Sequence, residues 1–186
     1  RGLGDVYKRQ GLGRGRQTDA LVRRLMDLPQ PLVLDADGIN ALAGHMDEWE
    51  RRRGRVTVLT PHEGEFLRVG GDLSQGRTAA AEDFARRSGA VVVLKGPGTV
   101  VAGPDGRCRV NTTGNCGMAK GGSGDVLSGV VLALLGLGMD AFDACCCAVW
   151  LHGRAGDLAA QEKGQWGMTP TDLLERLPQA LREVTE

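Results

Sequence analysis

Short apolar runs alternate with helical patterns along the chain, and this alternation limits the possible folds more than any other feature. The apolar runs are 31–35, 56–61 and 90–94, and the helical patterns beside them are 18–28, 39–45 and 76–87. Apolar runs of this length are typical of parallel strands that are buried on both faces. The alternation therefore predicts an α/β fold with an open, mostly parallel sheet.

The second half of the chain predicts a hairpin and then a helical region. Residues 99–102 and 107–111 flank Pro104-Asp105-Gly106, a turn sequence between two short β segments. After Gly122, apolar residues recur at three- and four-residue spacing, and Ser123 and Thr169 are plausible helix caps. The expected helices are 126–135, 142–160 and 171–184.

Composition excludes several functional classes. The 23 basic and 23 acidic side chains balance, and only one Tyr, three Phe and three Trp are present, so we expect no nucleic-acid partner. The apolar stretch Val126–Leu137 is too short to span a bilayer, which argues against a membrane protein. Cys145–Cys147 are consecutive and cannot pair with one another, and we expect the five cysteines to be small buried residues of a cytoplasmic protein.

Polar residues gather where the predicted strands end. They occupy 35–40, 60–65, 95–99 and 111–125. Open α/β sheets bind ligands beyond the carboxyl ends of their strands. The shared placement of these four segments therefore predicts a single site at that edge of the sheet.

The glycine-rich segment 115–125 leads directly into an apolar helix. Gly121, Gly122 and Gly124 leave backbone N–H groups free to face an anion at the positive end of the helix dipole, which favours a phosphate site. Lys120 either adds a cation or is simply solvated. The segment is not a Walker loop, and the alternative is a tight turn that caps the helix.

Asp125 lies in the first turn of that helix. The dipole favours its ionised form, which can accept a proton from a substrate hydroxyl. A carboxylate beside a phosphate site is otherwise repelled by it. This repulsion argues against a purely structural role for Asp125.

The segment 114–129, with Gly122-Ser123-Gly124-Asp125 at its centre, resembles the signature of the ADP-dependent NAD(P)H-hydrate dehydratases of the ribokinase-like superfamily. Further segments agree in order, namely 11–13, the DAD-containing 31–40, TPHEGEF at 60–66, KGPGT at 95–99 and LHGRAGD at 151–157. The resemblance covers nearly everything from Gly11 to Pro178 and implies a three-layer α/β/α ribokinase-like fold. Residues 1–10 look like a translated adaptor, so residues 11–186 are expected to form the C-terminal portion of one domain that is incomplete at its N-terminus.

The resemblance implies a repair reaction on damaged cofactor. The enzyme removes water from the S epimer of hydrated NADH or NADPH (NADHX or NADPHX), uses ADP as phosphoryl donor with Mg²⁺, and releases AMP and phosphate. Phosphoryl transfer turns a poor leaving group, hydroxyl, into a good one. Asp125 would accept the hydroxyl proton while the glycine amides stabilise the transferring phosphoryl group.

The resemblance also assigns the remaining site residues. Glu65 would hold Mg²⁺ through water. Asp35, Asp37 and Asn40 are either site residues, or Asp35 and Asp37 simply end the strand and cap the next helix, and His62 by itself is better explained as a surface histidine. His152 is interpreted as a hydrogen-bonded core histidine. The implied substrate-binding residues are Gly13, Asp37, Asn40, His62 and Asp125, and the nucleotide-binding residues are Lys95, Gly96, Thr99, Asn115, Gly121, Gly122, Ser123 and Gly124.

Two other functions fit the same residues. One is a ribokinase-like kinase that phosphorylates a hydroxyl of a vitamin precursor, and the other is a non-catalytic nucleotide-binding module. An epimerase, fused or separate, is the partner that the resemblance implies, and a homo-oligomer is expected. A sheet edge without its neighbouring strands would expose backbone groups and apolar faces, so we expect the isolated chain to be poorly soluble.

Overall fold

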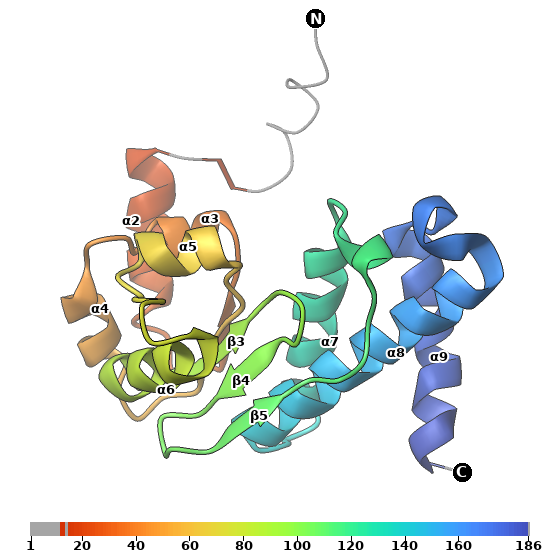
Figure 1. The fold of residues 1–186 in the computed structure, drawn as a ribbon. Coiled ribbons are helices and arrows are strands. Elements are labelled where there is room, and N and C mark those ends of the chain that lie inside the picture. The colour runs from red at the N-terminus through yellow and green to blue at the C-terminus, as the bar shows by residue number, and fades with distance from the viewer. Residues whose placement is uncertain (1–11, 14, 186) are drawn as a thin grey trace, which may run out of the picture.

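A five-stranded sheet organises the fold of the computed structural model, which describes residues 12, 13 and 15–185 (Figure 1). The strands lie in chain order: β1 (Leu32–Leu34), β2 (Thr57–Leu59), β3 (Val91–Leu94), β4 (Val100–Ala102) and β5 (Cys108–Val110). β1, β2 and β3 are parallel, and β4 runs antiparallel to both β3 and β5. All strands except β4 therefore point the same way, and the sheet is mixed, parallel from β1 to β3 and antiparallel from β3 to β5.

Helices cover both faces of this sheet, as Figure 1 shows. One layer holds α2 (Arg16–Leu25), α3 (Asp37–Asn40), α4 (Met46–Arg51), α5 (Glu63–Arg68) and α6 (Arg77–Ser88). The other holds α7 (Ser123–Gly136) and α8 (Ala141–Gly167), with α9 (Pro170–Thr185) packed on α8 and a 3-10 turn, η1 (Cys116–Met118), before α7. The three-layer arrangement is confirmed.

Alternation along β3 builds the two cores. Val92 and Leu94 pack in the core beneath α2–α6, whereas Val91 and Val93 pack against α7 and α8. All four side chains of β3 are buried. This explains why the strand reads as a continuous apolar run rather than an alternating one.

Two short helices were not expected from the sequence, and a third is displaced. α4 and α5 each have six residues, too few for a recognisable apolar period. α3 occupies Asp37–Asn40 rather than the expected 39–45. The hairpin of β4 and β5 is confirmed, and its turn is closed by the Gly103 N–H bond to the Arg107 carbonyl at 2.8 Å.

Of the two predicted helix caps, Thr169 is confirmed and Ser123 is wrong. Thr169 caps α9: its Oγ1 accepts from the Asp172 N–H at 3.3 Å, and Asp172 accepts from the Thr169 N–H at 2.8 Å. Ser123 is not a cap, because it is the first residue of α7 and the preceding Gly122 occupies the cap position. Gly122 has φ 99°, a left-handed conformation that glycine adopts without steric cost.

The cysteines are less uniform than expected. All five are free thiols; Cys145 is buried, Cys108 and Cys146 are half-buried, and Cys116 and Cys147 are exposed. Burial raises the pKa of Cys146 to about 11. Within the described residues no helix has the length and apolar character that a membrane span requires. The expectation for residues 1–10 falls outside the described part of the chain.

Candidate functional site

The carboxyl ends of the three parallel strands bring their polar residues together. Asp35 follows β1, and the short bridge between His62 and Lys95 continues the pairing of β2 with β3. Lys95 Nζ lies 2.8 Å from Asp35 Oδ1, in an ion pair that is mostly shielded from solvent. Ser128 of α7 donates to the other Asp35 oxygen at 3.1 Å. Asp35 therefore ties the sheet to the helix that follows the glycine-rich segment.

Ala36, which follows Asp35 of this ion pair, has a strained backbone conformation. Its φ of 48° is the one positive value among the described non-glycine residues. The Ala36 N–H donates to Asp35 Oδ1 at 2.9 Å, so the strained turn folds the carboxylate back over its own backbone. Residues held in rare backbone conformations concentrate at functional sites, and this one fixes Asp35 toward Lys95.

His62 and Glu65 form a reciprocal cap at the start of α5. His62 Nδ1 accepts from the Gly64 and Glu65 N–H groups at 3.0 and 3.3 Å, and the Glu65 carboxylate accepts from the His62 N–H at 2.9 Å. Glu65 is almost fully buried, and Lys95 Nζ is 4.0 Å from it. The capping bonds leave His62 Nε2 at the half-exposed edge of the ring, 3.4 Å from Glu65.

The glycine-rich segment meets the same cluster at the start of α7. A Cβ placed on Gly124 would lie 3.4 Å from Asp35 Oδ2 and 3.5 Å from Lys95 Nζ, so the first turn of α7 touches the ion pair. Asp125 is exposed in this turn, and within the described residues it makes no hydrogen bond or ion pair. An unpaired carboxylate beside exposed helix N–H groups can accept a proton from a bound molecule.

Lys120 and Asn115 have structural partners. Lys120 Nζ donates to the Trp166 carbonyl at 2.9 Å and to the Met168 carbonyl, so it binds the end of α8 and is not simply solvated. Asn115 accepts from the Gly117 N–H at 3.0 Å and donates to Asp157 of α8 at 2.9 Å. These bonds fix the shape of the segment.

The other predicted site residues lie in local contacts around this edge. The Gly13 N–H donates to Asp37 at 3.0 Å, and Asn40 accepts from Arg68 of α5 at 2.8 Å. Thr99 bonds to the Gly96 carbonyl at 3.1 Å and shapes the turn after β3. Neither Asp35 nor Asp37 caps α3, whose cap residue, Ala36, has no side-chain bond. This favours the site interpretation of the pair over the capping one.

Sequence reasoning gave no role to several residues that hold this site. Arg77 donates to the Leu94 carbonyl at 2.9 Å and clamps the turn that carries Lys95. A Cβ at Gly96 would lie 2.6 Å from this guanidinium, which would have to shift to make room for it. An arginine at the start of α6 carries no sequence signal for this contact. Ser128 lies inside the 114–129 segment, which is the signal that points to it.

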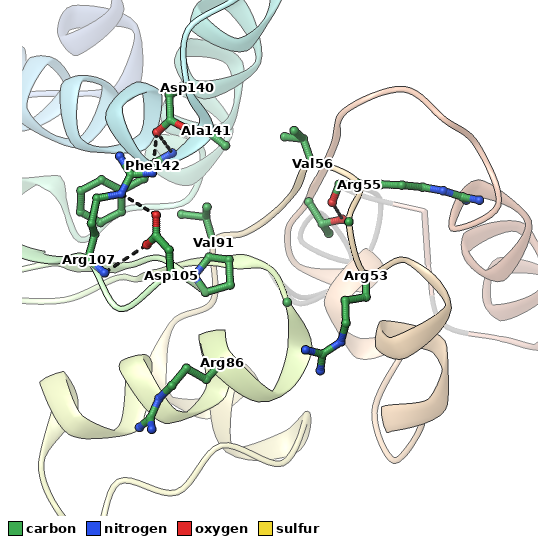
Figure 2. A pocket seen from close by; sticks show the side chains of 14 residues that line it. Arg53, Arg55, Val56, Arg86, Val91, Asp105, Arg107, Asp140, Ala141 and Phe142 are labelled. Atoms are coloured by element: carbon green, nitrogen blue, oxygen red, sulfur yellow. Dashed lines mark hydrogen bonds and ion pairs between the residues drawn. The ribbon is translucent and has the colours of Figure 1, made fainter.

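A cavity of about 340 Å³ lies at the opposite end of the sheet, where β2 and β3 begin (Figure 2). Its arginines are largely paired: Arg107 contacts Asp105 at 2.7 Å and Asp140 at 2.9 Å. Arg53 donates to a backbone carbonyl of α6 at 2.9 Å. None of the predicted site residues lines this cavity, so we place the candidate site at the carboxyl ends of the strands.

The model of one protein family, NAD(P)H-hydrate dehydratase (Carb_kinase), matches residues 10–179. The chain belongs to this family. A bifunctional NAD(P)H-hydrate repair enzyme Nnr from Thermofilum pendens is 45% identical over 181 residues, covering 95% of this chain and 34% of the relative.

Solved structures agree with this membership. The Bacillus subtilis ADP/ATP-dependent NAD(P)H-hydrate dehydratase, co-crystallised with ATP and Mg²⁺, superposes with a TM-score of 0.80 at 34% identity, covering 93% of this chain and 62% of that one. A ribokinase-like superfamily protein from Enterococcus faecalis gives a TM-score of 0.78 at 25% identity and covers 93% of this chain. The dehydratase-family chain thus has the ribokinase-like fold, and it spans about a third of the Thermofilum relative's length.

Proposed function

We propose that this protein catalyses the ADP-dependent dehydration of the S epimer of NADHX or NADPHX to NADH or NADPH. The observation that carries the proposal is the unpaired carboxylate of Asp125 in the first turn of α7, beside the ion pair of Asp35 and Lys95. Family membership supports the reaction class, and the names of the relatives support the substrate and the nucleotide.

The first step is phosphoryl transfer. The hydroxyl oxygen of the hydrated nicotinamide ring forms a bond to the β-phosphorus of ADP, the bond from that phosphorus to AMP breaks, and the hydroxyl proton passes to Asp125. The N–H groups of Gly121, Gly122 and Gly124 lie at the positive end of α7, where they would stabilise charge on the transferring group, whereas the Ser123 N–H donates to the Lys120 carbonyl at 3.3 Å.

The second step completes the dehydration. The new carbon–oxygen–phosphorus linkage breaks at carbon, phosphate leaves with the electron pair, and a proton leaves the adjacent ring carbon as the double bond forms. The balance is NADHX and ADP in, and NADH, AMP and phosphate out. The oxygen of the removed water therefore leaves within the phosphate.

The remaining residues divide between the two ligands. Lys95, Gly96, Thr99 and Asn115 would bind ADP, with Lys95 exchanging part of its contact with Asp35 for a phosphate oxygen. Gly13, Asp37, Asn40 and His62 would bind the hydrated cofactor from the side of α3 and α5. His62 would use Nε2 for this purpose, in place of its 3.4 Å contact with Glu65, because Nδ1 is occupied by the cap of α5.

The residues present fit a Mg²⁺ ion that is held mainly by the phosphates of the bound nucleotide. Mg²⁺ usually takes one or two carboxylates together with substrate phosphates and waters. Within the described residues no group of three or more His, Cys, Asp or Glu side chains could hold a metal by itself. Glu65 is buried and receives the His62 N–H, so it would reach the ion through water. Bound Mg²⁺ would neutralise phosphate charge.

The deciding experiment follows absorbance of the reduced nicotinamide band with NADHX, ADP and Mg²⁺. It uses this chain and also the chain extended by the N-terminal residues of the Bacillus subtilis relative that precede the matched region. We expect ADP-dependent recovery of absorbance that Asp125→Ala reduces at least a hundredfold, because general-base catalysis contributes about 10²–10⁴-fold. Asp19→Ala, which removes a half-buried first-turn carboxylate from α2, is the matched control.

Other outcomes separate the alternatives. ADP binding without recovery of absorbance in either form would contradict the proposal and favour a nucleotide-binding module. A stable phosphate ester that accumulates from a hydroxymethyl substrate with ATP would instead identify a kinase.

A further inference from the structure

One histidine of α8 touches the start of α7. His152 Nε2 lies 2.9 Å from the Ser123 carbonyl oxygen. Burial lowers the pKa of His152 to about 4, and the charge of Lys95 acts in the same direction. The ring is therefore neutral near pH 7, and because a carbonyl oxygen only accepts, Nε2 carries the proton and donates it.

The accepting carbonyl belongs to the peptide unit that supplies an N–H to the site. A trans peptide is planar, so the Ser123 carbonyl and the Gly124 N–H are fixed on opposite sides of one rigid unit. A bond that holds the carbonyl on the α8 side also fixes the direction of the Gly124 N–H. Donation to the carbonyl further polarises that N–H group.

The same stretch of α8 holds the preceding part of the glycine-rich segment. Asp157 accepts from the Gly114 N–H and from Asn115, both at 2.9 Å. Thr113 donates to the Trp150 carbonyl at 3.0 Å. The segment is thus bound to α8 on both sides of η1, and His152 makes the contact nearest to Asp125.

We propose that His152 is a positioning residue of the nucleotide site, which acts through the Ser123 carbonyl to orient and polarise the Gly124 N–H toward the transferring phosphoryl group. This rests on the proposed function. His152 itself touches neither ligand, and its side chain neither gives nor takes a proton in the reaction.

The test compares two amide replacements of different length. In His152→Gln the side-chain nitrogen reaches about as far as Nε2 and can donate to the same carbonyl, whereas in His152→Asn it is one methylene shorter. We expect the Asn variant to weaken ADP binding about tenfold, as the loss of one ordinary hydrogen bond would. We expect it also to lower kcat, while the Gln variant retains most of both.

Calorimetric titration with ADP and turnover of NADHX are measured on the same samples. Leu151→Ala, which removes a buried neighbour that packs toward α9, controls for destabilisation of α8. It should lower the unfolding temperature and leave ADP affinity unchanged.

Two outcomes would overturn the inference, and a third would overturn the proposed function on which it rests. Equal ADP affinity and kcat in the Asn, Gln and wild-type proteins would overturn it. Equal loss in the Asn, Gln and Leu151→Ala proteins would also overturn it, because a packing role would then suffice. If the wild type neither binds ADP nor turns over NADHX, the proposed function fails instead, which is a distinguishable result.

Discussion

Ala36 shows how one residue links strain to the site. Replacement by glycine removes a backbone penalty of about 1–3 kcal/mol and adds about 0.5–1 kcal/mol of unfolded-state entropy. We therefore expect Ala36→Gly to stabilise the fold by about 1 kcal/mol in urea unfolding. The freer turn should also loosen Asp35 and lower kcat several-fold. A variant that is neither more stable nor slower would show that the turn is not strained by its side chain.

His152 makes the stability of the fold depend on pH. Its pKa is about 4 in the folded chain and about 6.5 when unfolded, so the unfolded state binds the proton first as pH falls. The contribution of the neutral ring is complete above pH 6.5 and is lost progressively down to pH 4, by about 3 kcal/mol.

The glutamine side chain of the His152→Gln variant takes up no proton between pH 7 and pH 4. The difference in unfolding free energy between wild type and His152→Gln should therefore shift against the wild type by that amount between pH 7 and pH 4. Urea unfolding at several pH values measures it, and a pH-independent difference would contradict the buried neutral ring.

At the scale of elements, Gly153 lets α8 approach the backbone just before the glycine-rich segment. A Cβ on Gly153 would lie 2.2 Å from Thr113 Oγ1 and 2.8 Å from its carbonyl oxygen. Because backbone cannot yield as a side-chain tip does, we expect Gly153→Ala to displace the segment, destabilise the fold by about 1–3 kcal/mol and weaken ADP binding. Thermal unfolding and calorimetry measure the two effects.

Gly129 of α7 is the matched control, since a Cβ there meets nothing within 4 Å. Gly129→Ala should stabilise the helix by up to about 1 kcal/mol. If Gly153→Ala were equally harmless, α8 would not be the element that shapes the segment.

Helices and strands with a strong hydrophobic period could be predicted from the sequence, whereas the side-chain contacts between them could not. The run around β3 and the apolar pattern of α7 follow from side-chain burial alone, and Asp35, His62 and Lys95 follow from their place after strands. The sequence did not reveal α5, because its start depends on a reciprocal cap between His62 and Glu65 rather than on periodicity. The bond from His152 to Ser123 joins residues 29 positions apart, and no local pattern encodes such a pairing.

At the scale of the whole molecule, the edge of the sheet at β1 bears on how copies of the chain associate. Among the described strands β1 is an edge strand, and the chain covers 62% of the length of the Bacillus subtilis dehydratase structure. Apolar side chains are also exposed on neighbouring helices, Leu21 of α2 and Leu132 of α7 among them. Unpaired strand edges with exposed apolar groups pair with other chains.

We therefore expect the isolated chain to self-associate at micromolar concentration, and the chain extended by the relative's N-terminal residues to do so much less. Sedimentation velocity across a concentration series distinguishes the two. Replacing Val33 of β1 by lysine tests the mechanism, because a charge on an edge strand opposes pairing between sheets. Val33 also packs against the core beneath α7 and α8, so Leu174→Lys on the exposed side of α9 is the control for charge alone. An isolated chain that is monodisperse and unfolds cooperatively would show that β1 is protected without added sequence.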